Sequence, residues 1–124
     1  MKECLLVAVG GASGAVLRYL LSLLPVAAAF PLVTLGINAV AALLMGFFTG
    51  WLDLSTALGA DLALLLRVGF CGGFSTLSLL ALEVVDLAQT QHILAAAVYV
   101  FLTLALCIGG ILLGENLAAA VFSK

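Results

Sequence analysis

Charged residues are rare in this sequence. Lysine, arginine, aspartate and glutamate together make up 8% of the 124 residues, whereas hydrophobic residues make up 66%. Soluble globular domains carry about 25% charged residues and about 45–50% apolar residues, so this composition excludes a water-soluble domain. The four basic residues form no stripe that would neutralise phosphates, which argues against nucleic acid as a partner. The composition predicts a small multi-pass protein of the lipid bilayer.

Motifs for structural metal binding, disulfide bonding and catalysis are also missing. Cys4, Cys71 and Cys107 lie singly in apolar runs. They lack the spacing of a zinc site or a disulfide framework, so we interpret them as small buried hydrophobic residues. The sequence contains no nucleophile–base pair, no HExxH motif and no pair of carboxylates placed for acid–base chemistry. We therefore expect a protein that is not an enzyme.

Four long apolar runs account for most of the chain and predict an all-α membrane protein with four transmembrane helices. Pro25 ends the first run and Pro31 precedes the second. The fourth run is expected to end before Gly114, which two polar residues follow. The predicted spans cover about residues 4–24, 32–52, 60–87 and 93–113, all within a single transmembrane domain of residues 1–124.

The third run has an unusual middle, Gly69–Ser78, with the sequence GFCGGFSTLS. Three glycines in five residues disfavour a continuous membrane helix, because glycine has a low helix propensity. The serines and threonine that follow them provide hydroxyl groups for freed backbone groups. We therefore expect a broken helix, with a continuous glycine-rich helix packed closely against a neighbour as the alternative.

Several polar side chains lie within or beside the predicted spans. Arg18 would cost about 2.5–3.5 kcal/mol at the bilayer centre, so it acts either as an anchor or in attracting an anion. Asn38 offers two N–H donors, which suit either a small anion or a helix–helix hydrogen bond. Glu83 is a carboxylate with a partner, a protonated acid, or a residue close to the membrane interface. Arg67 suits an interface anchor, and His92 is expected in solvent.

A stripe of polar residues lies within the fourth predicted span. Tyr99, Thr103 and Cys107 are spaced four residues apart and therefore share one helix face. Either a polar track along a pore wall or a packed helix interface explains this spacing.

A small proton-coupled multidrug transporter would match this chain in length and number of spans. Such a transporter needs a membrane-embedded carboxylate in its first helix to exchange protons for cations. The first predicted span contains Arg18 and no carboxylate after Glu3. This difference disfavours cation export.

Three segments together resemble the CrcB/Fluc family of fluoride channels. Gly10–Tyr19 (GGASGAVLRY) resembles the family pattern GGxxGAxxRY, Thr34–Asn38 (TLGIN) resembles TLxxN, and Gly69–Ser78 resembles GFCGGxTTFST. The resemblance implies a fluoride-selective channel that exports fluoride passively across the cytoplasmic (inner) membrane and confers fluoride resistance. It also implies an antiparallel, dual-topology dimer with two pores and a central sodium ion.

The resemblance also assigns roles to individual residues. It implies that the backbone carbonyls of Gly72 and Ser75 hold the sodium ion, with Ser75 replacing a threonine. Matching positions place the following residues along the fluoride pathway: Asn38, Thr76, Leu77, Ser78, Leu80, Glu83, Tyr99, Thr103 and Cys107.

Leu77 and Leu80 depart from the family pattern, because they stand where the family has two pore phenylalanines. An aromatic ring can contact an anion through its positive edge, whereas leucine methyl groups offer much less. The chain is therefore a variant homodimeric channel, one half of a heterodimer, or a subunit that has lost conduction. The retained Asn38, Gly72 and Gly73 favour the homodimer.

The distribution of positive charge bears on how the chain is oriented. Lys2, Arg67 and Lys124 fall toward one side of the membrane and Arg18 toward the other. Such a weak asymmetry does not specify one orientation. We therefore expect both orientations in the membrane.

Overall fold

Every regular element in the described part of the chain is helical. The computed structural model describes residues 1–26, 30–54 and 59–122. Its elements are α1 (Lys2–Ser22), α2 (Leu32–Leu54), α3 (Gly59–Ala63), η1 (Leu64–Cys71), α4 (Gly72–Phe74), α5 (Leu77–Gln89) and α6 (Ile93–Phe122).

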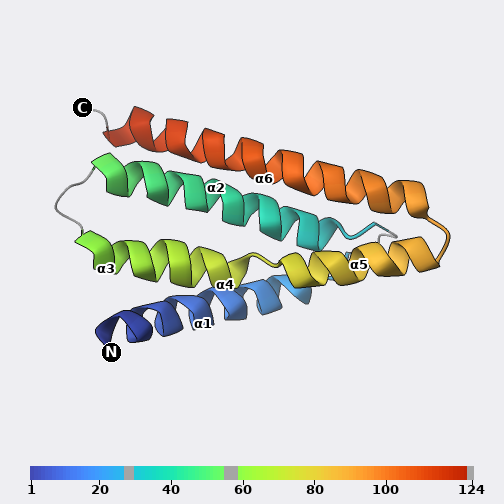
Figure 1. Ribbon diagram of the computed structural model, residues 1–124, viewed down its shortest axis with the longest axis horizontal. Coiled ribbons are helices and arrows are strands. Elements are labelled where there is room, and N and C mark those ends of the chain that lie inside the picture. The colour runs from blue at the N-terminus through green and yellow to red at the C-terminus, as the bar shows by residue number, and fades with distance from the viewer. Residues whose placement is uncertain (27–29, 55–58, 123–124) are drawn as a thin grey trace.

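Four helical stretches are long and apolar enough to cross a membrane: Lys2–Ser22, Leu32–Asp53, Gly59–Gln89 and Ile93–Phe122. The chain is thus an all-α, multi-pass membrane protein, as its composition predicts. The elements from α3 to α5 follow one another along a single bent span (Figure 1).

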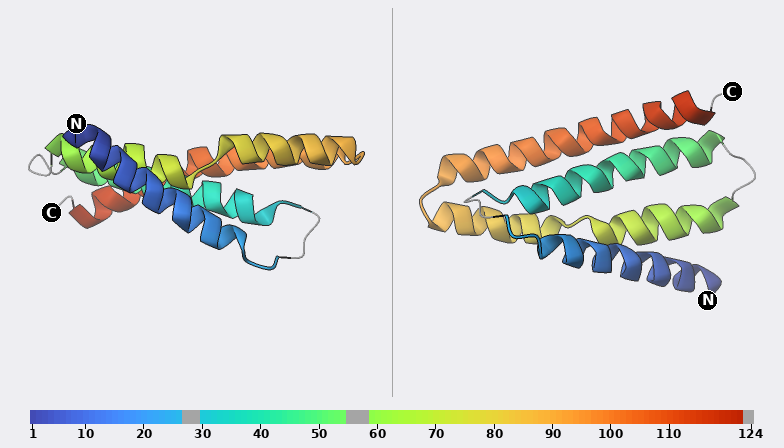
Figure 2. Two further views of the ribbon diagram at one scale, coloured as in Figure 1. Left: turned by 90° about the horizontal axis from the view of Figure 1, so that it is seen from below. Right: turned by 180° about the vertical axis from the view of Figure 1, so that it is seen from behind.

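The spans lie side by side in a bundle (Figure 1). α2 packs along α6, while α1 packs against η1 and α4. The hairpin of α5 and α6 projects past the ends of α1 and α2 (Figure 2). Met1 and the C-terminal end of α6 lie at the same end of the bundle, as an even number of spans requires. At that end Lys2 and Asp61 form an exposed ion pair between α1 and α3.

The last helix extends further than the sequence predicts. α6 continues through Gly114 to Phe122, so the expected helix end near residue 113 is wrong. A side chain at Gly114 would come within 2.6 Å of the Phe47 backbone nitrogen, so this glycine allows a close helix approach instead of ending the helix. The Trp51 ring stacks on Phe122 with ring centroids 5.8 Å apart, which holds the added turns against α2. Where the membrane span ends within α6 stays a prediction, and Lys124 lies outside the described residues.

The break in the third span is confirmed, but it lies after the glycines. The chain is π-helical from Leu64 to Cys71 and α-helical through Phe74. It then becomes extended at Ser75 (ψ 158°) and Thr76 (ψ 111°). The Thr76 hydroxyl accepts a hydrogen bond from the Leu79 N–H at 3.2 Å and so caps α5. The helix is therefore interrupted at the hydroxyl residues Ser75 and Thr76.

The glycines of the third span allow close packing against α1. A Cβ atom on Gly73 would lie 2.9 Å from the Gly11 Cα, and one on Gly69 would lie 2.9 Å from the Gly10 Cα. No side chain fits at such distances, so these glycines let two helix backbones meet directly. The glycine-rich segment thus combines both structures that the sequence suggests, close packing first and a break after it.

Candidate functional site

Asn38 on α2 pairs with the backbone at the break. The Thr76 N–H donates to Asn38 Oδ1 at 2.8 Å, and Asn38 Nδ2 donates to the Thr76 carbonyl at 3.1 Å. Because a backbone N–H needs an acceptor, this pairing determines which way the carboxamide points. Both residues are buried. The second N–H of Asn38 has no hydrogen-bond acceptor among the described residues, and it remains available for a ligand.

Arg18 reaches the same break from α1. Its Nε donates to the Gly73 carbonyl at 3.4 Å, and the side chain is half-buried. A cation near the last carbonyls of a helix is electrostatically favourable. Of the two roles that the sequence leaves open for Arg18, this contact supports anchoring, while anion attraction stays a prediction.

Glu83 is held by two hydroxyl groups from neighbouring helices. One carboxylate oxygen accepts from Thr34 Oγ1 at 2.6 Å and the other from the Tyr99 hydroxyl at 2.6 Å. The Phe30 ring packs edge-on against Tyr99, which is fully buried. Of the three interpretations of Glu83, the geometry supports a carboxylate with partners. The spacing of the sequence carries a signal for Thr34, because Thr34 lies one helical turn before Asn38 on the same helix face.

Two open cavities meet at Asn38. The first has a volume of about 290 Å³ and lies between α2, α5 and α6; it is lined by Asn38, Ser75, Thr76, Leu77, Leu80, Val100, Thr103, Leu104 and Cys107. The second has a volume of about 200 Å³ and is lined by Asn38, Ala41, Ala42, Met45, Cys71, Ser75, Cys107 and Ile111. The structure therefore brings together six of the predicted pathway residues in the first cavity: Asn38, Thr76, Leu77, Leu80, Thr103 and Cys107.

The remaining pathway residues lie outside that cavity. Tyr99 and Glu83 belong to the hydrogen-bonded group that they form with Thr34. This group adjoins the cavity through Leu80, which lines the cavity and also packs against Tyr99. Ser78 is exposed and is not among the residues that line either cavity.

The polar stripe of α6 faces the other helices. The Thr103 hydroxyl donates to the Tyr99 carbonyl at 2.8 Å, and Cys107 Sγ lies 3.6 Å from the Asn38 carbonyl oxygen. The stripe thus packs against α2 and lines a cavity at the same time.

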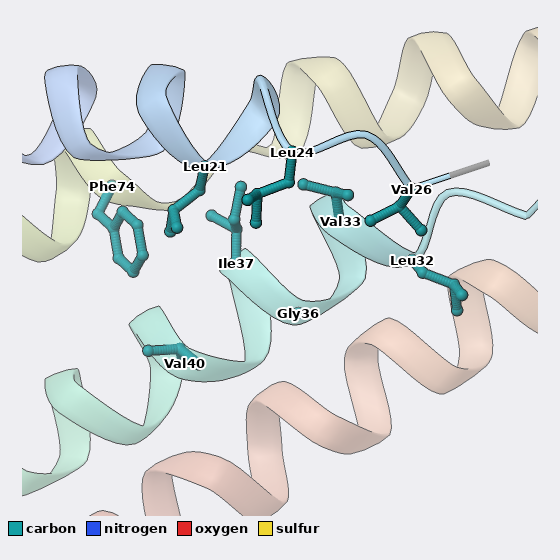
Figure 3. A pocket seen from close by; sticks show the side chains of 9 residues that line it. All are labelled: Leu21, Leu24, Val26, Leu32, Val33, Gly36, Ile37, Val40 and Phe74. Atoms are coloured by element: carbon teal, nitrogen blue, oxygen red, sulfur yellow. The ribbon is translucent and has the colours of Figure 1, made fainter. Parts of the chain in front are cut away.

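Only aliphatic groups stand at the two positions where the family pattern has aromatic rings. Leu77 is 77% exposed, and Leu80 is 9% exposed. The nearby ring of Phe74 does not replace them, because it stacks on Phe70 and lines a separate apolar cavity with Leu21 and Ile37 (Figure 3).

Gly72 and Ser75 have the chemistry that a sodium ion requires. The Thr76 N–H lies four residues after Gly72, where it would ordinarily bond to the Gly72 carbonyl, yet it donates to Asn38 instead. This frees a hard oxygen ligand on an exposed part of the chain. Hard cations take about six or more oxygen ligands, so the two carbonyls of one chain fit only part of such a site.

The other singled-out residues lie elsewhere. His92 is exposed, and Arg67 is half-buried in η1. Cys71 is buried and Cys107 is half-buried, but Cys4 is exposed on α1, so the expectation of three buried cysteines is wrong for Cys4.

A family model described as "CrcB-like protein, Camphor Resistance (CrcB)" matches residues 5–115. The chain belongs to the CrcB family. Its sequence is 39% identical over 123 residues to a protein of Methanopyrus kandleri named "Fluoride-specific ion channel FluC", covering 98% of this chain and 93% of that protein. Proteins of the same name from Ignicoccus hospitalis and Novosphingobium aromaticivorans are each 40% identical, over 119 and 126 residues. Those alignments cover 95% and 98% of this chain, and 96% and 99% of the two relatives. The resemblance seen in the three motifs is confirmed, and these CrcB-family relatives are named as ion channels, a class distinct from enzymes.

Proposed function

We propose that this chain forms a fluoride-selective channel that exports fluoride passively across the cytoplasmic membrane and so confers fluoride resistance. The observation that carries the proposal is the Asn38 carboxamide, held by Thr76 with one N–H left over beside an open cavity. A dehydrated anion needs such preorganised donors. The names of the relatives support fluoride as that anion.

The pathway runs along the cavity beside the broken helix. Asn38 and the Thr103 hydroxyl offer polar groups there, and Cys107 offers a weaker donor. Ser78 adds an exposed hydroxyl beyond it, and the buried Tyr99 positions the Glu83 carboxylate. Transport needs neither nucleotide nor covalent chemistry, so the protein is not an enzyme.

The working channel contains two antiparallel chains. Gly72 and Ser75 of each chain supply carbonyl oxygens to one sodium ion at the dimer centre, so the two chains together provide four of its oxygen ligands. We favour a homodimer, since the break, Asn38 and the two carbonyls are all retained. The aliphatic Leu77 and Leu80 favour a second candidate, a heterodimer in which another subunit supplies the aromatic rings.

Fluoride efflux from liposomes that carry the purified protein tests this function. We expect efflux of fluoride and none of chloride when an electrical shunt is provided. Efflux that requires a ring-bearing homologous subunit supports the heterodimer over the homodimer. Absence of fluoride flux in both preparations contradicts the channel, and acid-driven uptake of a cationic drug would then support a multidrug transporter.

A further inference from the structure

Three sulfur-containing side chains line the second cavity. Met45 comes from α2, Cys71 from η1 and Cys107 from α6, and all three border the same volume of about 200 Å³. The chain has only five sulfur-containing residues, and the other two, Met1 and Cys4, lie at its N-terminus. Three distant segments therefore bring every sulfur-containing residue of the later spans to the wall of one cavity.

The chemistry of this cavity suits a soft metal ion. Thiolate and thioether sulfurs prefer soft ions such as copper(I). None of the described residues that line the cavity is charged. A monovalent ion bound by one thiolate and neutral sulfurs forms a complex with no net charge, which limits the cost of placing it within a membrane protein.

We propose that Met45, Cys71 and Cys107 form a binding site for a soft monovalent cation, copper(I) or silver(I). One cysteine thiol loses its proton as its sulfur bonds to the metal, and the proton leaves to solvent through the open cavity. The other two sulfurs bind through lone pairs, and no atom is oxidised or reduced.

Metal binding also blocks the ion pathway, a consequence that rests on the proposed function. Cys107 and Asn38 line both cavities, and Cys107 Sγ lies 3.6 Å from the Asn38 carbonyl oxygen. That oxygen belongs to the Asn38 backbone, so a cation on Cys107 lies next to Asn38, in space that both residues line along the proposed pathway. The site makes fluoride transport sensitive to soft metals.

Silver binding to the purified full-length chain tests the site directly. A Cys4→Ser variant serves as the parent, because it removes the exposed thiol, and silver nitrate is the probe in chloride-free buffer. We expect one silver ion per chain by equilibrium dialysis and metal analysis. Even outer-shell partners of metal ligands contribute about 10- to 100-fold to affinity, so Cys107→Ser and Cys71→Ser are each expected to weaken binding by at least about tenfold.

Two further variants keep the test decisive. Cys71→Ala replaces Cys71→Ser where a buried hydroxyl prevents folding, and Met45→Leu conserves volume while removing the thioether. We expect Met45→Leu to bind silver more weakly than the parent. Unchanged affinity in the Cys71 and Cys107 variants overturns the site, and so does binding of two silver ions that each depend on a single cysteine.

Fluoride efflux provides the second measurement, with each variant compared with its own silver-free rate. Silver is expected to lower efflux through the Cys4→Ser parent, dithiothreitol to restore it, and Cys107→Ser to resist the block. Silver that binds without slowing efflux overturns the block. A parent without any efflux contradicts the proposed function, whereas the dialysis result still decides the metal site.

Discussion

The Asn38 carboxamide and the Thr76 peptide group pair through two hydrogen bonds of 2.8 Å and 3.1 Å, across 38 residues of sequence. The pair satisfies backbone groups that a broken membrane helix would otherwise leave unbonded. It also diverts the Thr76 N–H from the Gly72 carbonyl. One side chain thus stabilises the break, orients a free N–H and releases an oxygen ligand.

Asn38→Asp is expected to abolish most fluoride efflux and to lower stability. The substitution removes both N–H donors and places an oxygen against the Thr76 carbonyl, and an unsatisfied buried polar group costs about 1–3 kcal/mol. Efflux assays and thermal unfolding in detergent measure the two effects. Thr49→Ala is the matched control, because Thr49 lies on the same helix and, within the described part of the chain, its hydroxyl bonds only to the Met45 carbonyl. Unchanged efflux in the Asn38→Asp variant would mean that Asn38 contributes only to helix packing and not to fluoride transport.

Glu83 and Tyr99 are expected to act as a coupled pair. Tyr99→Phe removes one donor to the Glu83 carboxylate, and Glu83→Gln removes the charge that strengthens both hydroxyl contacts. Residues in one hydrogen-bond network show coupling energies of about 0.5–3 kcal/mol. A double-mutant cycle in the unfolding free energy measures this coupling. Strict additivity of the two substitutions would contradict a stabilising contact between them.

Gly73→Ala is expected to destabilise the protein by about 1–3 kcal/mol, because the added methyl group overpacks the contact with Gly11. Gly109→Ala is the matched control. A Cβ atom there meets none of the described residues within 4 Å, and alanine is favoured over glycine within a helix by about 0.5–1 kcal/mol. Thermal unfolding of the two variants compares them. Equal unfolding temperatures would mean that α1 and the third span do not cross so closely.

Leu77→Phe is expected to increase fluoride efflux through the chain on its own. Leu77 is 77% exposed, so a ring fits there without overpacking and brings a positive aromatic edge to the pathway. Leu104→Phe adds the same ring to this cavity from α6, and is expected to obstruct it. Rates of fluoride efflux from liposomes distinguish the two variants. Similar rates for Leu77→Phe and the unmodified chain would show that a ring at position 77 adds nothing.

The sequence by itself determined the four spans, the bent third span and the polar residues within the membrane. Each of these depends on local properties: the length of an apolar run is matched to bilayer thickness, and glycines followed by hydroxyl residues weaken a helix at that place. For the same reason Asn38 and Glu83 could be recognised as unusual before their partners were known.

Only the tertiary structure decided which residues meet. The pairing of Asn38 with Thr76, the Thr34 bond to Glu83 and the sulfur-lined cavity all join separate helices. Those contacts depend on how closely and at what angle the helices cross. Close glycine contacts between helices, such as Gly10–Gly69, determine that crossing. The end of α6 depends on tertiary packing for the same reason, because Gly114 resembles a helix terminator in the sequence but is a packing contact against α2 in the fold.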